Sequence, residues 1–152
     1  MKHCLSALAC CLLLSTAAPV AASEERATAT LESRQGLLRM VRFYFGPILG
    51  MVRQQIPFDG DVVSHNATKI AELSAMIPDA FALDTTEYDL ETEALDNIWS
   101  NMDDFNGKAA TVVERANALA AAGAGGLEAT QKAFGAMGGA CKACHDEYRV
   151  QN

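Results

Sequence analysis

Positive charge is scarce in this chain. Its 152 residues include 12 Lys and Arg against 19 Asp and Glu, so the formal net charge is −7. Nucleic acids and anionic membranes are bound by clustered Lys and Arg, so neither is an expected partner, and a protein partner would be basic. The sequence also lacks the alternation of apolar and polar residues that marks a half-buried strand, and we therefore predict no β-sheet.

Long apolar runs are missing too, apart from one at the start. Residues 1–22 carry Lys2, then an apolar run over residues 5–14, then small residues before Ser23. This order is typical of a secretory signal peptide, and the run is too short to anchor the chain in a bilayer. We predict that residues 1–22 are removed and that residues 23–152 form one domain in the bacterial periplasm, without membrane insertion.

Cysteine and histidine become rare once residues 1–22 are set aside. The remaining chain keeps two cysteines, Cys141 and Cys144, and two histidines, His65 and His145. A structural zinc site normally needs four protein ligands, so we do not expect zinc. No further cysteine is present to build a disulfide network in an oxidising compartment, which leaves the two thiols available for another role.

The two cysteines belong to the run Cys141-Lys142-Ala143-Cys144-His145, a C-x-x-C-H motif that predicts covalent attachment of c-type haem. On a helix, positions i, i+3 and i+4 share one face, so both thiols and the imidazole point the same way. The thiols would form thioethers with the porphyrin vinyl groups, and His145 would be the proximal iron ligand. A thioredoxin-like pair would follow a strand. A single disulfide stays open as an alternative but gives His145 no role.

Apolar residues recur at helical spacing through the rest of the chain. We predict four helices, at about residues 24–55, 59–77, 100–122 and 127–149, and an acidic loop over residues 79–99. We expect Pro47 to bend the first helix, Asp59 to cap the second and Pro78 to end it. Ser100 is expected to cap the third helix. The predicted fold is all-α: an antiparallel four-helix bundle with one covalently bound haem c near the C-terminal helix.

Two departures from the helical pattern lie near the expected haem. Arg34 occupies a position on the apolar seam of the first helix, where it would bind a haem propionate or extend to solvent. Three glycines, Gly135, Gly138 and Gly139, precede the cysteines although glycine disfavours a helix interior. They would let the porphyrin approach the backbone or allow ordinary close packing of helices.

Nearly the whole of residues 23–152 resembles the cytochromes c prime, the high-spin class II cytochromes c of bacteria. In those proteins the C-x-x-C-H motif lies near the C-terminus, as it does here. The residues that carry the resemblance are Arg34-Gln35 with Leu38, Phe45-Gly46-Pro47, Pro57-Phe58-Asp59, Glu91-Thr92, Ile98-Trp99, Ala133-Phe134-Gly135 and the run over residues 141–149.

The resemblance implies a role for individual positions around the haem. Cys141 and Cys144 match the thioether cysteines, and His145 matches the fifth iron ligand. Leu38 matches the apolar residue that covers the distal face and leaves the iron five-coordinate. Arg149 matches a basic residue beside the proximal imidazole.

Further positions match residues at the edge of the haem. Arg34 and Gln35 match the residues that contact the haem propionates. Glu91 and Thr92 match loop residues near the haem edge, and the chain then departs from the family by having Glu93 where Lys or Arg is frequent.

The sixth position of the iron decides the expected function. An apolar lid over five-coordinate iron admits a small neutral gas, so the leading hypothesis is a gas-binding haem protein that takes NO or CO, transfers electrons, or does both. A methionine ligand would instead give a low-spin electron-transfer cytochrome, which is the main alternative. The chain offers Met40, Met51, Met76, Met102 and Met137, although methionine at helical spacing is usually core filler.

Other expectations concern partners and turnover. No catalytic acid and base can be placed near the distal face, so we do not expect an enzyme. A bundle without haem, used for interaction or metal storage, is a third hypothesis. The resemblance implies a homodimer through the first two helices, with which Phe43, Tyr44 and Leu49 are compatible, and a redox partner protein is possible. We expect His65 to be a surface residue.

Overall fold

A computed structural model describes residues 23–151, so the predicted signal peptide lies outside the described residues. The four long helices are α1 Glu24–Val52, α2 Gly60–Ser74, α5 Met102–Ala122 and α6 Gly126–Tyr148. Two short helices, α3 Ile77–Ala80 and α4 Asn97–Ser100, and a 3₁₀ turn, η1 Gly123–Gly125, connect them. The prediction of an all-α four-helix bundle is confirmed, and none of the described helices is long and apolar enough to cross a membrane.

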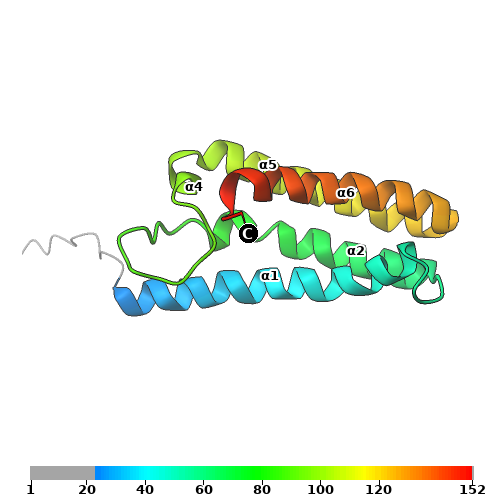
Figure 1. The fold of residues 1–152 in the computed structure, drawn as a ribbon, viewed down its shortest axis with the longest axis horizontal. Helices are drawn as coiled ribbons and strands as arrows, with labels where there is room; N and C mark the ends of the chain where they lie inside the picture. The colour runs from blue at the N-terminus through cyan, green and yellow to red at the C-terminus, as the bar shows by residue number, and fades with distance from the viewer. Residues whose placement is uncertain (1–22, 152) are drawn as a thin grey trace, which may run out of the picture.

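The helices are arranged as two layered pairs. Figure 1 shows α1 and α2 side by side beneath α5 and α6. Packing is extensive between α1 and α2, between α2 and α5, and between α5 and α6, whereas α1 and α6 touch over only a short stretch. The bundle is therefore loosely closed along the α1–α6 seam, and the C-x-x-C-H motif is on one of the two helices that border this seam.

Local chemistry explains where the first two helices begin. The Ser23 hydroxyl accepts a hydrogen bond from the Arg26 amide, 3.2 Å away, at the start of α1. The Asp59 carboxylate accepts hydrogen bonds from the first amides of α2, as predicted. The helix α1 continues past Pro47 as one element to Val52.

Two predicted helix boundaries were wrong. The second helix ends at Ser74, and Pro78 lies in the first turn of α3. Proline suits a first turn because the amide that it lacks has no partner there, so Pro78 begins a helix instead of ending one. Ser100 does not cap the third helix. It is the last residue of α4, its hydroxyl donates to the Asn97 carbonyl, and α5 begins at Met102.

Two apolar clusters fill the bundle. The larger joins α1, α2, α5 and α6, and the smaller lies at the end where the loop over residues 81–96 crosses. Cys141 packs against the larger cluster and Cys144 against the smaller one, so the haem-attachment residues lie where the two clusters meet. The larger cluster contains Ile48, Met51, Val63, Ala67, Ile70, Ala71, Ala116, Leu119 and Met137, and the smaller contains Phe81, Ile98, Phe105 and Tyr148.

Candidate haem-binding site

The two thiols are free and half-buried on the inner side of α6. Burial is the main cause that raises the pKa of each thiol above its ordinary value, and the nearby Lys108 ammonium partly opposes this at Cys144. Both cysteines are therefore neutral thiols at neutral pH, held three residues apart on one face of a continuous helix. This arrangement is what addition across two porphyrin vinyl groups requires.

His145 follows on the same helix and is exposed. Partial loss of water around the ring lowers the pKa of His145, and the Arg149 guanidinium lowers it further, while Asp146 and Glu93 act in the opposite direction. A lowered pKa favours the neutral imidazole, which is the form that binds a metal. No three His, Cys, Asp or Glu side chains converge as a metal site within residues 23–151. An iron held by four porphyrin nitrogens needs only one such ligand from the protein.

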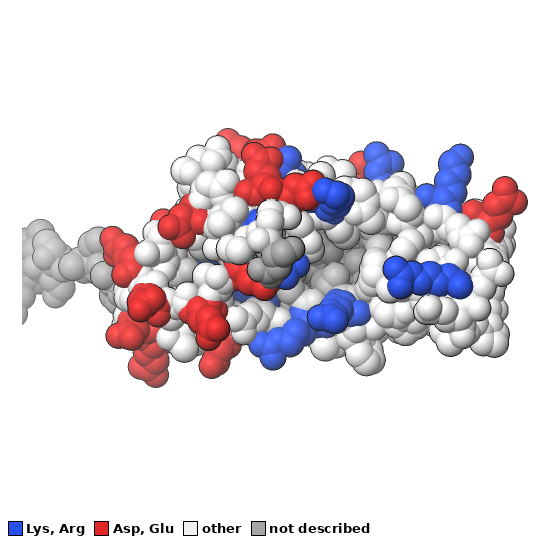
Figure 2. Space-filling model, in the orientation of Figure 1, with Lys and Arg blue, Asp and Glu red and all other residues white. Residues whose placement is uncertain are grey.

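The three glycines before the cysteines face open space. A Cβ atom built on Gly135, Gly138 or Gly139 would meet no other part of the described chain within 4 Å. Close packing of helices is therefore wrong as an explanation for these glycines. Figure 2 shows the molecular surface hollowed between α1 and the upper pair of helices. A flat group lying against this part of α6 would meet no side chain at these positions, and the two free thiols and the imidazole that follow are the groups that would hold a porphyrin.

Arg34 is buried, with only 3% of its surface exposed, so extension to solvent is wrong as an explanation for its seam position. Its Nε donates to the Ala80 carbonyl at 2.8 Å, its Nη1 to the Thr85 hydroxyl at 2.9 Å and its Nη2 to the Leu83 carbonyl. Each terminal nitrogen keeps a second N–H. Contact with a propionate therefore stays a prediction, in addition to an observed role of Arg34 in holding the loop.

Aromatic rings complete the surroundings of this guanidinium. The Cζ atom of Arg34 lies 4.8 Å from the ring centroid of Phe81 and 5.1 Å from that of Trp99. The Trp99 indole donates to the carbonyls of Phe81 and Leu83, at 3.0 and 3.1 Å. Burial lowers the pKa of Arg34, and the Asp84 carboxylate partly offsets this. The start of the loop is thus fixed to α1 by one side chain.

Gln35 and Leu38 lie at the surface of α1. The Gln35 side-chain oxygen accepts a hydrogen bond from Arg39 at 3.0 Å. Leu38 is one turn beyond Arg34 and is 41% exposed. A leucine left this exposed is available to cover a bound group, and the distal role of Leu38 stays a prediction.

The loop residues expected near the haem edge are also exposed. Glu91 and Thr92 face solvent, and the Thr92 hydroxyl accepts a hydrogen bond from the Ala94 amide at 3.1 Å. Arg149 is tied to the same loop, because its Nε donates to the Glu93 carboxylate at 2.8 Å. Sequence reasoning missed this partner of Arg149, since residues 56 positions apart carry no local signal of contact.

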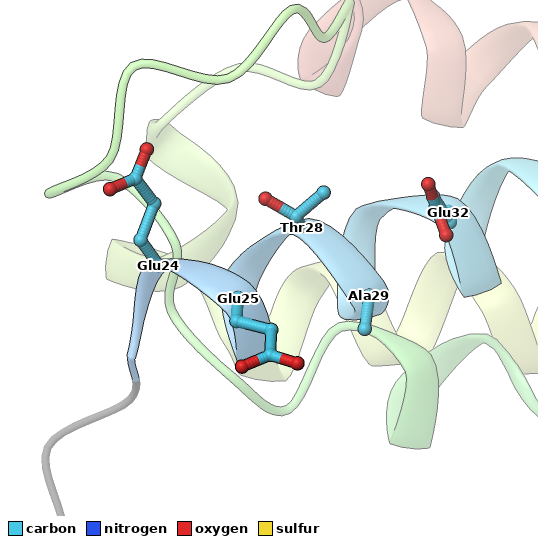
Figure 3. A pocket seen from close by; sticks show the side chains of 5 residues that line it. All are labelled: Glu24, Glu25, Thr28, Ala29 and Glu32. Carbon is cyan, nitrogen blue, oxygen red and sulfur yellow. The ribbon is translucent and has the colours of Figure 1, made fainter.

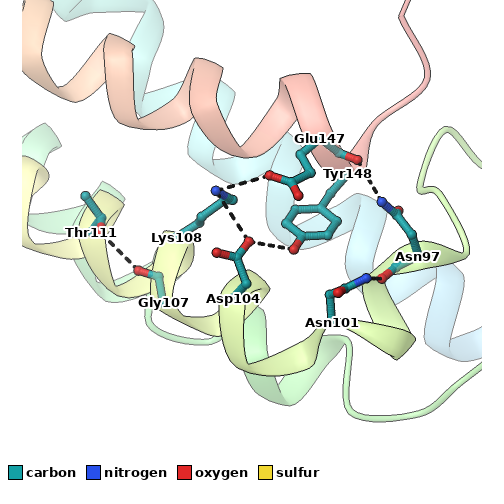
Figure 4. A network of polar contacts seen from close by, with 8 residues as sticks. All are labelled: Asn97, Asn101, Asp104, Gly107, Lys108, Thr111, Glu147 and Tyr148. Carbon is teal, nitrogen blue, oxygen red and sulfur yellow. Dashed lines mark hydrogen bonds and ion pairs between the residues drawn. The ribbon is translucent and has the colours of Figure 1, made fainter.

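A second polar network, also missed, joins α5 to the end of α6 (Figure 4). The Tyr148 hydroxyl donates to the Asp104 carboxylate at 2.6 Å. The Lys108 ammonium lies 3.3 Å from carboxylate oxygens of both Asp104 and Glu147. The bond from Tyr148 is the main cause that lowers the pKa of Asp104, and burial, followed by that bond, raises the pKa of Tyr148. The network holds the haem-attachment helix against α5.

A pocket beside the first turns of α1 is a separate feature (Figure 3). Its lining residues are Glu24, Glu25, Thr28, Ala29 and Glu32. The lining contains neither a thiol nor an imidazole, and none of its residues is a predicted haem contact. This pocket is therefore not an alternative haem site.

Comparison with known proteins identifies the family. The family model described as cytochrome c' matches residues 29–149. The chain belongs to the cytochrome c prime family. Haem c is the cofactor of this family, and the C-x-x-C-H motif provides for its attachment, as predicted.

Individual relatives agree with this assignment. The chain is 33% identical over 140 residues to cytochrome c' of Cereibacter sphaeroides, covering 91% of this chain and 94% of that protein. It is 32% identical over 124 residues to cytochrome c-554 of the same organism, covering 80% of this chain and 81% of that protein. The solved nitric oxide complex of a leucine-to-alanine variant of cytochrome c prime from Alcaligenes xylosoxidans superimposes with a TM-score of 0.73 at 31% identity, covering 83% of this chain and 97% of that one.

Proposed function

We propose that this cytochrome c prime is a periplasmic haem c protein whose five-coordinate, high-spin iron binds small diatomic gases such as NO and CO and also transfers electrons. Cys141 and Cys144 hold the porphyrin covalently and His145 binds the iron. The bound haem supplies a metal centre that accepts a diatomic ligand or an electron. The protein supplies the selectivity for small neutral ligands, without catalytic turnover.

The single observation that carries the proposal is the exposure of Leu38 on the helix that faces the hollow. An apolar side chain there excludes water and anions but moves aside for a diatomic molecule. Met40 is two residues beyond Leu38 on α1, about 200° round the helix, so it does not share the face of Leu38. Met51 and Met137 are buried in the larger cluster, Met76 is on the surface, and Met102 packs against the smaller cluster. The nitric oxide complex of the Alcaligenes relative supports the same ligand class.

Around this centre, Arg34 and Gln35 bind the propionates, Arg149 lies on the proximal side, and Glu91 and Thr92 line the haem edge. The remaining N–H groups of Arg34 support the first role. Figure 2 shows acidic side chains gathered at the end of the molecule where α1 begins. A redox partner with a basic surface would complement that end.

A homodimer through α1 and α2 is part of the proposal. Phe43 on α1 is 66% exposed, and Met40 and Val62 are also exposed apolar residues of these two helices. A second copy of the chain would cover them. Sedimentation of the haem-loaded protein should give twice the monomer mass, and replacing Phe43 by Glu should halve it.

Absorption and electron paramagnetic resonance spectra of the exported, haem-loaded protein test the function. We expect a high-spin ferric spectrum, and a ferrous form that binds CO and NO. A low-spin spectrum with a methionine-to-iron band, and no reaction with CO, would identify an electron-transfer cytochrome and refute the proposal. A colourless protein after maturation would refute haem binding itself, and recovery of a precursor that retains residues 1–22 would refute export.

A further inference from the structure

The loop that crosses the end of the bundle is joined to the end of the iron-binding helix. The Val150 amide donates to the Glu93 carbonyl at 2.8 Å, and the Leu95 amide donates to the Tyr148 carbonyl at 3.0 Å. Between these bonds, Ala94 and Arg149 form an isolated antiparallel bridge. The backbone therefore fixes Ala94 opposite Arg149, and so holds the neighbouring Glu93 beside Arg149 independently of their side chains.

The side chains of the two residues then form an ion pair. The Nε and Nη2 atoms of Arg149 lie 2.8 and 2.5 Å from one carboxylate oxygen of Glu93. The Arg149 amide also donates to the His145 carbonyl at 3.2 Å, so the pair is anchored to the turn that carries the iron ligand. The pair is about half exposed, at 45% for Arg149 and 54% for Glu93.

Both charges act on the imidazole of His145. The charged groups that shift its pKa are Arg149, Asp146 and Glu93. Asp146 already has its own partner, the Lys142 ammonium, at 2.7 Å. Arg149 is therefore the positive charge that acts on the iron ligand, and Glu93 is the carboxylate paired directly with it.

We propose that Glu93 is a positioning residue that holds the Arg149 guanidinium and cancels its charge beside His145, and so sets the reduction potential of the bound iron. The inference rests on the proposed haem ligation. Ferric iron carries one positive charge more than ferrous iron, so an uncancelled guanidinium nearby favours the ferrous state. An uncancelled carboxylate favours the ferric state.

Potentiometric titration of the haem-loaded protein, followed by its absorption spectrum, tests this opposition. Glu93→Gln leaves Arg149 unopposed, so the ratio of ferrous to ferric protein at a fixed applied potential should rise several-fold. Arg149→Gln removes the positive charge beside His145 and keeps the Glu93 carboxylate, so the ratio should fall. The double variant removes both charges and should return towards the wild-type ratio. A tenfold change in this ratio is about 59 mV for a one-electron couple.

A matched control distinguishes the effect of this ion pair from the effect of any charge change in the loop. Glu87→Gln makes the same charge change at an exposed position of the same loop, and Glu87 is not among the groups that shift the pKa of His145. We expect its potential to equal that of the wild type. Because the pair is exposed, the shifts of the single variants should shrink as salt is added.

Two outcomes would overturn the inference. If both single variants move the potential in the same direction, the pair acts only by holding the loop in place. If neither moves it relative to Glu87→Gln, the pair has no effect on the iron. The haem content of each variant is measured separately, so a loss of haem ligation is distinguished from a failure of this inference.

Discussion

Replacing Arg34 by methionine should detach the start of the long loop from α1. The substitution keeps a long, buried side chain but removes all three hydrogen bonds that the guanidinium donates to Ala80, Leu83 and Thr85. It also removes the stacking of the guanidinium on two aromatic rings. The Leu83 carbonyl keeps its bond from Trp99, so two of the three acceptors lose their only partner among the bonds described.

The size of the effect follows from these contacts. Hydrogen bonds from a charged donor contribute about 1.5–3 kcal/mol each, so the three together contribute about 5 kcal/mol at the low end. Removing a buried charge also removes its desolvation cost, which offsets part of that loss. We expect the free energy of unfolding to fall by about 3 kcal/mol, within the range for breaking a buried polar network.

Urea denaturation of the haem-loaded protein, followed by circular dichroism, measures this loss. With a slope of about 2 kcal/mol per molar urea, the midpoint should fall by about 1.5 M. Arg39→Met is the matched control, because Arg39 is an exposed arginine of the same helix whose hydrogen bonds within residues 23–151 go to Gln35, and it should change stability by less than about 0.5 kcal/mol.

A second variant weakens the hold on the loop without changing Arg34, the residue expected to contact the haem propionates. Trp99→Phe removes the indole bonds to the Phe81 and Leu83 carbonyls, and should destabilise the protein by about 1–2 kcal/mol. If Arg34→Met lowers the free energy of unfolding no more than Arg39→Met does, the loop does not depend on Arg34. The reasoning from the buried hydrogen bonds of Arg34 is then refuted.

The remaining predictions concern the site itself. Leu38→Ala should speed CO and NO binding in stopped-flow measurements and admit larger ligands, and unchanged rates would remove Leu38 from the distal role. Gly138→Leu should lower the haem content per chain while helicity is kept, because its side chain would occupy open space beside α6, and exposed Ala136→Leu on the same helix should leave haem content unchanged. The Tyr148 bond lowers the pKa of Asp104 below 3.8 in the folded protein, so its stabilisation is present above about pH 4 and is lost as the pH falls through the lowered value. Asp104→Asn should therefore be less stable than wild type at pH 7 and approach it in acid. A constant difference in the free energy of unfolding from pH 7 to acid, measured in urea titrations, would contradict the role assigned to the hydrogen bond from Tyr148.

Sequence reasoning succeeded where the signal was local. The C-x-x-C-H run and the helical spacing of apolar residues predicted the fold and the cofactor because each depends on neighbours within two or three turns. Pro78 misled because proline suits both the position after one helix and the first turn of the next. Ser100 misled for a similar reason, since a serine near a helix start has several backbone partners within reach.

The contacts that could not be predicted join distant segments. Arg34 was recognised as a polar residue on an apolar seam, but its carbonyl partners come from a loop about 50 residues later. No spacing rule indicates the path of an irregular loop, so the role of Arg34 in holding the loop could not be predicted. The same holds for Glu93, whose contact with Arg149 exists only because the loop returns to the end of α6.

The slight contact between α1 and α6 has a consequence for what the cofactor does for stability. A porphyrin joined to α6 and covered by Leu38 of α1 would touch both helices, so it would supply the apolar contact that the two helices make only sparsely with each other. We therefore expect the haem to stabilise the α1–α6 seam more than the other three helix interfaces.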